Sequence, residues 1–118
     1  FQKALDDGYQ KMIVITTRDK EYRKDLNKPQ HKNGLKALYG KYPNFIQTAL
    51  DYPRRYNEDA AKLEDLENRG LAFIIRPRNP ITLKRTEKDK AELQKVYERG
   101  RAAATELLPK MMEYIKNE

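Results

Sequence analysis

Two short runs of apolar residues constrain the fold of this chain more than any other feature. The first, residues 12–16, reads MIVIT, and the second, residues 71–76, reads LAFIIR. The first is rich in β-branched side chains, which is typical of a strand that is covered on both faces, and the second predicts another apolar strand that leads to a basic residue. The stretch between them has helical patterning, and a crossover of that kind predicts two parallel strands whose carboxyl ends share one edge of a sheet.

Outside residues 18–33, the remaining apolar positions before residue 71 follow helical spacing. Residues 1–8 indicate the end of a helix, with Gly8 as its C-terminal stop. The next segment, 18–33, has no periodicity and predicts a long loop, followed by a short helix at 35–39. Residues 43–50 and 53–68 predict two helices, the second of them amphipathic, that are separated or kinked at Pro53, because proline removes a backbone donor.

The C-terminal part of the chain predicts one more strand and a long helix. Alternating apolar residues at 81–84 indicate a possible short edge strand. Thr86 and Asp89 have the spacing of a helix start, and the apolar stripe that follows runs to Ile115 with a kink or a fresh start at Pro109. The fold class is therefore α/β, with a small parallel sheet packed with helices and a helical C-terminus.

Several kinds of chemistry are excluded by composition. The 118 residues contain no serine and no cysteine, and the one histidine, His31, lies among polar residues in a loop. The glycines form none of the known phosphate-binding or nucleophile motifs. We therefore expect no catalytic residue, no metal site and no cofactor in this chain. The absence of cysteine favours a cytoplasmic protein, and no apolar run is long enough to cross a bilayer.

Basic residues follow both predicted strands, and the chain carries a formal net charge of +7. If the strands are parallel, these cations converge on one edge of the sheet, where they could bind an anionic lipid or headgroup. The alternative is an ordinary solvated surface, which is what most runs of charge are. The candidate binding residues are Arg18, Lys20, Arg23, Lys24, Arg76 and Arg78.

In four segments taken in order, the sequence resembles the C-terminal part of bacterial patatin-like phospholipases. The segments are ALDDGYQKMIVITTR at 4–18, YRK at 22–24, YPRRYNEDAAKLEDLENRGLAFIIRP at 52–77, and KRTEKDKAELQKVYERG at 84–100. Together they extend over most of the chain. The resemblance implies a hydrolase of lipid metabolism that cleaves acyl esters with a Ser-Asp dyad.

The resemblance also implies that this chain lacks both members of the dyad. In that family the serine lies in G-x-S-x-G and the aspartate in a later Asp-Gly-[Gly/Ala] motif. Asp7 precedes Gly8 here, but it aligns with the helix end beyond the family's aspartate motif and is not assigned as catalytic. The chain also begins at Phe1 without an initiator methionine, so we expect residues 1–118 to be one C-terminal segment of a longer protein.

The expected function is thus the non-catalytic C-terminal portion of a patatin-like phospholipase. The chain would complete the α/β sheet and border the active-site edge with a basic loop, Arg18 to Lys24. Its partners would be the upstream catalytic region and an anionic lipid or membrane surface, at a cytoplasmic, peripheral location. The alternatives are a basic nucleic-acid-binding module, for which recognition motifs are lacking, and a protein-interaction module whose long helices pair with another chain. The sequence sets no oligomeric state.

Overall fold

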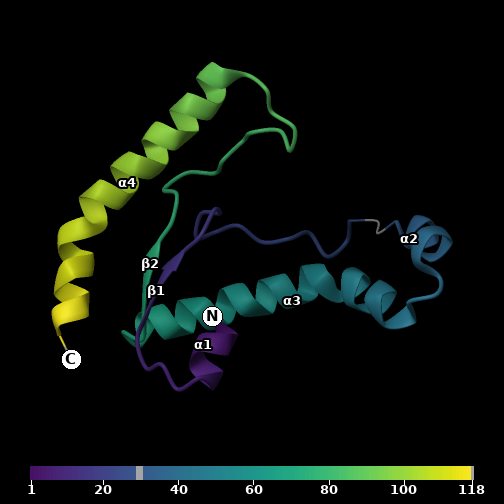
Figure 1. Cartoon of the computed structure of the whole chain (residues 1–118), viewed down its shortest axis with the longest axis horizontal. Coiled ribbons are helices and arrows are strands. Elements are labelled where there is room, and N and C mark those ends of the chain that lie inside the picture. The colour runs from purple at the N-terminus through teal and green to yellow at the C-terminus, as the bar shows by residue number, and fades with distance from the viewer. Residues whose placement is uncertain (29–30, 118) are drawn as a thin grey trace. The chain divides into compact units, whose positions relative to one another are not determined.

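The structure has two strands with helices before, between and after them, as the sequence predicts. The computed structural model describes residues 1–28 and 31–117. The elements are, in chain order, α1 (Gln2–Asp6), β1 (Met12–Ile15), α2 (Lys32–Tyr39), α3 (Pro43–Asn68), β2 (Ala72–Ile75) and α4 (Lys90–Lys116) (Figure 1). The predicted α/β class with a helical C-terminus is confirmed.

The two strands pair in parallel, as the crossover requires. Met12 lies opposite Ala72, and Ile15 lies opposite Ile75. The ladder extends one residue beyond the strands at each end, because the Met12 N–H donates to the Leu71 carbonyl at 3.1 Å and the Thr16 N–H to the Ile75 carbonyl at 2.9 Å. The carboxyl ends of β1 and β2 therefore share one edge of the sheet.

Both strands are entered through the same kind of turn. Gly8 follows α1 with φ of +88°, and Gly70 follows α3 with φ of +72°, a conformation that glycine adopts without steric cost. In each turn the N–H of the residue after the glycine donates to the carbonyl five positions earlier. Tyr9 donates to Ala4, and Leu71 donates to Leu66. These are the bonds of a helix end closed by a left-handed residue, so the predicted role of Gly8 is confirmed.

The two faces of the sheet differ in how well they are covered. Ala72 and Ile74 are 4% and 7% exposed, whereas on the other face the ring of Phe73 lies 5.6 Å from that of Tyr114 in α4. On β1, Ile13 and Ile15 remain 40% and 74% exposed. The prediction that both faces are covered is therefore wrong for β1, because α4 packs along β2.

The short edge strand predicted at 81–84 does not form. In the described part of the chain the sheet contains only β1 and β2, and residues 76–84 have no strand pairing. Pro77 and Pro80 each lack the N–H that a ladder needs. The side chain of Ile81 is instead half-buried beside α4, where it lines a cavity described below.

The helix boundaries also differ from those expected. α4 begins at Lys90, because the carboxylate of Asp89 accepts from the Ala91 N–H at 2.8 Å, and Thr86 is not the cap. α3 continues through Pro53 and α4 through Pro109, so of the two alternatives expected at each proline, a division into two helices does not occur. A proline costs one hydrogen bond and a local clash, which the remaining hydrogen bonds of a long helix can outweigh.

The chain divides into two compact units. The first, called the sheet unit, comprises residues 1–22 and 66–118 and holds α1, both strands and α4. The second, called the α3 unit, comprises residues 23–65 and holds α2 and most of α3. In the α3 unit, Ile46 is buried, and the rings of Tyr39 and Phe45 lie 4.9 Å apart.

Candidate functional site

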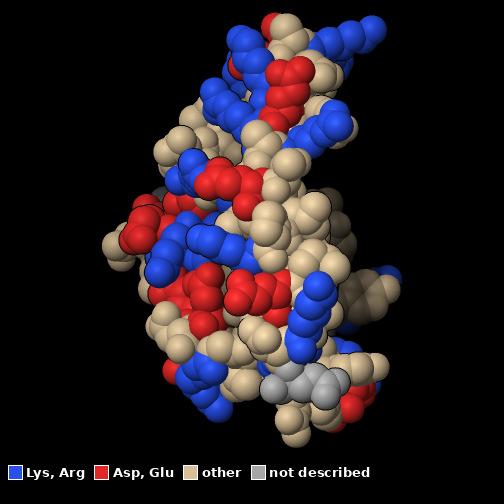
Figure 2. All heavy atoms as spheres, turned by 90° about the vertical axis from the view of Figure 1, so that its left-hand side faces the viewer, with Lys and Arg blue, Asp and Glu red and all other residues tan. Residues whose placement is uncertain are grey.

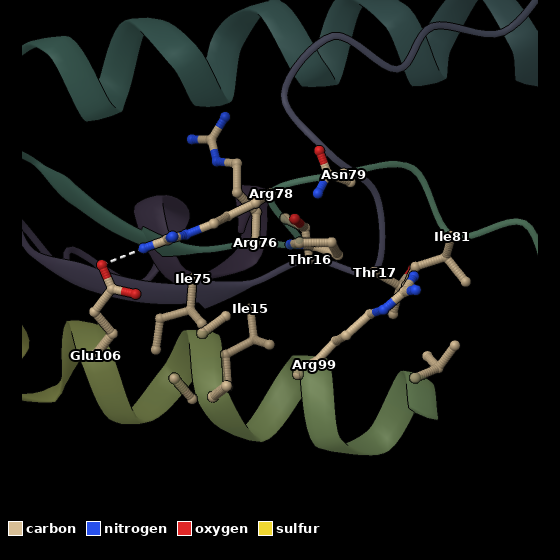
Figure 3. A pocket seen from close by; sticks show the side chains of 16 residues that line it. Ile15, Thr16, Thr17, Ile75, Arg76, Arg78, Asn79, Ile81, Arg99 and Glu106 are labelled. Atoms are coloured by element: carbon tan, nitrogen blue, oxygen red, sulfur yellow. Dashed lines mark ion pairs between the residues drawn. The ribbon is translucent and has the colours of Figure 1, made fainter. Parts of the chain in front are cut away.

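A cavity of about 840 Å³ opens at the carboxyl ends of the two strands, wholly within the sheet unit. Its walls are the last residues of β1 and β2, the segment that follows β2, and one face of α4. Figure 3 shows Ile15 and Ile75 between the strands and α4. Most of the lining is apolar, and it includes Ile15, Ile75, Pro77, Ile81, Val96 and Ala103.

Polar groups lie at both ends of this cavity, with Arg99 near Thr17 at one end and Glu106 at the other (Figure 3). Thr16 and Thr17 directly follow β1, Asn79 lies on the segment after β2, and Arg99 and Glu106 belong to α4 (Figure 3). The volume is within the range of about 300–1,000 Å³ that small-molecule pockets have, and the combination of apolar walls with a few polar groups is also typical of them.

Arg76 and Arg78, two of the predicted binding residues, line the cavity and are both ion-paired. Arg76 bonds to the carboxylate of Glu67 at the end of α3, and its side chain is only 17% exposed. Arg78 forms an ion pair with Glu106 across the cavity, marked by the dashed line in Figure 3. Both guanidinium groups are therefore paired with a carboxylate of the sheet unit.

Arg18 and Lys20 lie in the turn after β1 and do not line the cavity. The guanidinium of Arg18 lies 4.5 Å from the centre of the Tyr22 ring, a cation–π contact. The hydroxyl of Thr16 donates to the Arg18 carbonyl at 2.9 Å, which fixes the start of this turn.

Arg23 and Lys24 belong to the α3 unit and serve to hold the basic loop on α3. Arg23 pairs with Glu64 at 2.7 Å. The ammonium of Lys24 lies 4.8 Å from the centre of the Tyr52 ring, and 5.2 Å from that of a second tyrosine at 56. Asn57 accepts from the Lys24 N–H at 2.8 Å and donates to the Lys24 carbonyl at 3.0 Å. These contacts therefore give the two cations a structural role, which is an alternative to the predicted role in ligand binding.

Comparison with protein families gives one match, to the domain of unknown function DUF6363, over residues 42–116. That range is more than half of the chain. The chain belongs to the DUF6363 family. No curated protein and no solved structure matches it.

The match of this DUF6363 chain begins just before α3 and ends at the last residue of α4. It thus includes β2 and every residue that α4 contributes to the cavity, but not β1. In the described residues we find no cluster of three His, Asp or Glu side chains that could hold a metal ion. None of the helices described is long and apolar enough to cross a membrane.

Arg99 is the functional candidate that sequence reasoning missed in this DUF6363 chain. Among residues 1–28 and 31–117 it has no carboxylate partner, and in Figure 3 it extends from α4 toward Thr17. Its α4 neighbours in the lining, Val96, Gly100 and Ala103, were interpreted as core. Their small size is the signal that could have been used, because small side chains facing a sheet leave space.

Charge on the visible side of this DUF6363 chain is mixed. Figure 2 shows Lys and Arg side chains interspersed with Asp and Glu side chains over the face that it presents. A net charge of +7 is therefore not gathered there into a field of one sign. The cavity, where charge is arranged around apolar walls, is the stronger candidate for specific binding.

Proposed function

We propose that this chain is the non-catalytic C-terminal portion of a patatin-like lipid acyl hydrolase. In this proposal the sheet unit completes a larger parallel sheet, and its cavity and basic residues border the active-site edge. The observation that carries the proposal is the incompleteness of the sheet. Parallel sheets normally have several strands that are covered on both faces. In the described residues this sheet has two strands, and on one face the side chains of Ile13 and Ile15 are exposed.

The free edge of β1 supports an added strand. Met12 and Thr16 donate their N–H groups to β2. Along a strand the backbone groups alternate in direction, so those of Ile13 and Ile15 point to the opposite edge. In the described residues no other strand pairs with β1. An apolar strand with an unpaired edge is a surface that proteins normally cover.

α4 supports the same conclusion from its own surface. One stripe of this helix, which includes Tyr114, packs on β2, whereas an adjacent stripe of large apolar side chains remains exposed. Large exposed apolar stripes mark sites where another polypeptide or an apolar ligand packs. The exposed stripe consists of Leu93, Tyr97, Leu108, Met112 and Ile115.

The composition of the chain indicates which parts of the proposed enzyme it supplies. Because the chain has no serine, the nucleophile of such a hydrolase is supplied by the upstream catalytic region. This part contributes sheet, helices and cations, and requires no cofactor or metal. The proposal places the whole enzyme in the cytoplasm, at the periphery of an anionic membrane.

The test is to express this chain together with the polypeptide encoded immediately upstream of Phe1. That polypeptide should contain G-x-S-x-G and Asp-Gly-[Gly/Ala]. The two parts should purify as a complex that hydrolyses acyl esters, and the amides of Ile13 and Ile15 should become protected from hydrogen exchange. An Ile13→Lys variant should weaken the complex, and the matched Gln47→Lys variant, at an exposed position of the α3 unit, should not. An upstream sequence without these motifs, or no change in exchange at β1, would overturn the proposal.

The exposed stripe of α4 also favours a second candidate, a protein-interaction module in which α4 pairs with another chain. Light scattering after size-exclusion chromatography distinguishes the two. A dimer that dissociates in a Leu108→Glu variant favours the interaction module, whereas a monomer that binds only the upstream region favours the hydrolase.

A further inference from the structure

The cavity of the sheet unit combines apolar walls with one cation that has no counter-charge. Of the three arginines in its lining, Arg76 is paired with Glu67 and Arg78 with Glu106. Arg99 has no carboxylate partner among residues 1–28 and 31–117. The cavity therefore offers one positive charge that a bound anion could neutralise.

The position of Arg99 relative to the apolar walls defines the shape of a ligand. Figure 3 shows Arg99 rising from α4 beside Thr17 and Ile81, at one end of the cavity, while Ile15 and Ile75 lie further along it. A ligand that contacts both must carry its charge at one end and an apolar body behind it. The hydroxyl of Thr17 adds a hydrogen-bond donor for an anionic oxygen near the same end, whereas that of Thr16 already donates to the Arg18 carbonyl.

Space for the apolar body is created by the small residues of α4. A Cβ built on Gly100 has no atom within 4 Å, although this residue lies in the wall of the cavity. Ala103, one turn further along the helix, also lines it. Because α4 presents no large side chain over this stretch, the exposed face of Ile15 stays accessible from the cavity.

We propose that this cavity binds a single-chain anionic amphiphile, with its acyl chain along Ile15 and Ile75 and its anionic head at Arg99. The inference deepens the proposed function and rests on it for the choice of a lipid as ligand. It assigns the cavity to the product or substrate chain of ester cleavage, namely a fatty carboxylate or a lysophospholipid. Charge complementarity at Arg99 is what selects an anion over a neutral or cationic amphiphile.

The first test is calorimetric titration of the 118-residue chain with dodecanoate below its micelle concentration. We expect one saturable site. Decanoate should bind about tenfold more weakly, because each buried methylene contributes a factor of about three to four. Dodecyltrimethylammonium, which has the same chain and the opposite charge, should bind at least about tenfold more weakly than dodecanoate. Lauroyl lysophosphatidate, in a parallel titration, distinguishes a phosphate head from a carboxylate head.

Two variants and a matched control locate the site. Arg99→Glu should weaken dodecanoate binding by about tenfold or more and reverse the preference between the two heads. Arg101→Glu, which changes an exposed arginine of α4 outside the cavity, should leave binding unchanged. Gly100→Leu should abolish binding of every chain length, since its side chain fills the cavity without a backbone clash. Circular dichroism checks that each variant is folded, and the same titrations are repeated on the complex with the upstream region.

Several results would overturn the inference. These are equal binding by Arg99→Glu and Arg101→Glu, binding that survives Gly100→Leu, or association with anionic vesicles but not with any single-chain amphiphile. The outcomes also separate the two proposals. If the chain binds the amphiphile but never pairs with the upstream region, the hydrolase proposal is wrong and the cavity site stands. If it pairs with the upstream region but binds no amphiphile, the cavity site is wrong and the hydrolase proposal stands.

Discussion

The basic loop after β1 and the cationic end of the cavity look alike in sequence and behave differently in the structure. In the loop, the Lys24 ammonium lies 4.8 and 5.2 Å from the centres of two tyrosine rings, and its backbone is bonded twice to Asn57. At the cavity, Arg99 has neither a carboxylate nor a ring partner in the described residues. The role of a cation in this chain therefore depends on whether residues distant in sequence lie close enough to contact it.

The largest expected effect comes from the loop. Asn57→Ala removes both bonds to the Lys24 backbone and leaves part-buried groups without partners, so it should lower the free energy of unfolding by about 1–2 kcal/mol, after allowance for the better helix propensity of alanine. Urea denaturation measures this. Asn79→Ala, in the wall of the cavity, is the matched control and should change stability by less than about 0.5 kcal/mol. Equal losses would remove the distinction between the two regions.

A somewhat smaller effect is expected for the lysine itself. Lys24→Met keeps the length of the side chain and removes the charge that faces the Tyr52 ring, so it should cost about 0.5–1 kcal/mol. Arg99→Met should leave the unfolding free energy unchanged, because Arg99 has no partner to lose in the described structure. If the arginine variant is the less stable of the two, Arg99 has a structural role that the contacts do not reveal.

At Gly100, where there is open space beside α4, a substitution is expected to raise stability rather than lower it. Gly100→Ala should raise the free energy of unfolding by about 0.5–1 kcal/mol, because alanine favours the helix and its Cβ meets no atom within 4 Å. Thermal unfolding measures the gain. Gly70→Ala is the control with the contrary result: its φ of +72° is unfavourable for alanine, so this variant should lose stability. A loss in both variants would mean that the cavity wall is closely packed.

The smallest expected effect concerns pH. A hydrogen bond from Arg54 lowers the pKa of Asp51 on α3 below its usual value of 3.8. A carboxylate with a lowered pKa in the folded state stabilises fully above its unfolded pKa, and this contribution is lost as the pH falls through the folded pKa. Wild type should therefore lose slightly more stability below about pH 4 than Asp51→Asn does. Arg54→Gln should show the same reduced acid dependence, and an unchanged profile in both would contradict the assignment.

Local patterns were sufficient for the main elements. The apolar runs of 12–16 and 71–76 predicted both strands, and the helical stretch between them required that they run parallel. Gly8 was identified as a helix stop because few other residues adopt a positive φ. The start of α4 was misplaced by a few residues, since Thr86 and Asp89 are both good caps and only the observed bonds from Ala91 and Glu92 decide between them.

The candidate site was harder to predict than the fold. Arg76 and Arg78 were expected at the strand ends and lie there, but their pairing with Glu67 and Glu106 depends on residues outside the local motif. Arg99 was not singled out, because nothing in its surrounding sequence distinguishes it from the other cations of α4. Its position at the cavity follows from how α4 packs along β2.

By itself, the sequence determined which segments become helix and strand and that the two strands are parallel, because these properties depend on spacing and side-chain shape within a few residues. The tertiary structure alone decided that Ile13 and Ile15 stay exposed, that Lys24 is held by Asn57, and that Arg99 faces a cavity. These depend on contacts between residues distant in sequence, and the energy of such contacts is set by distance and burial rather than by neighbouring residue types.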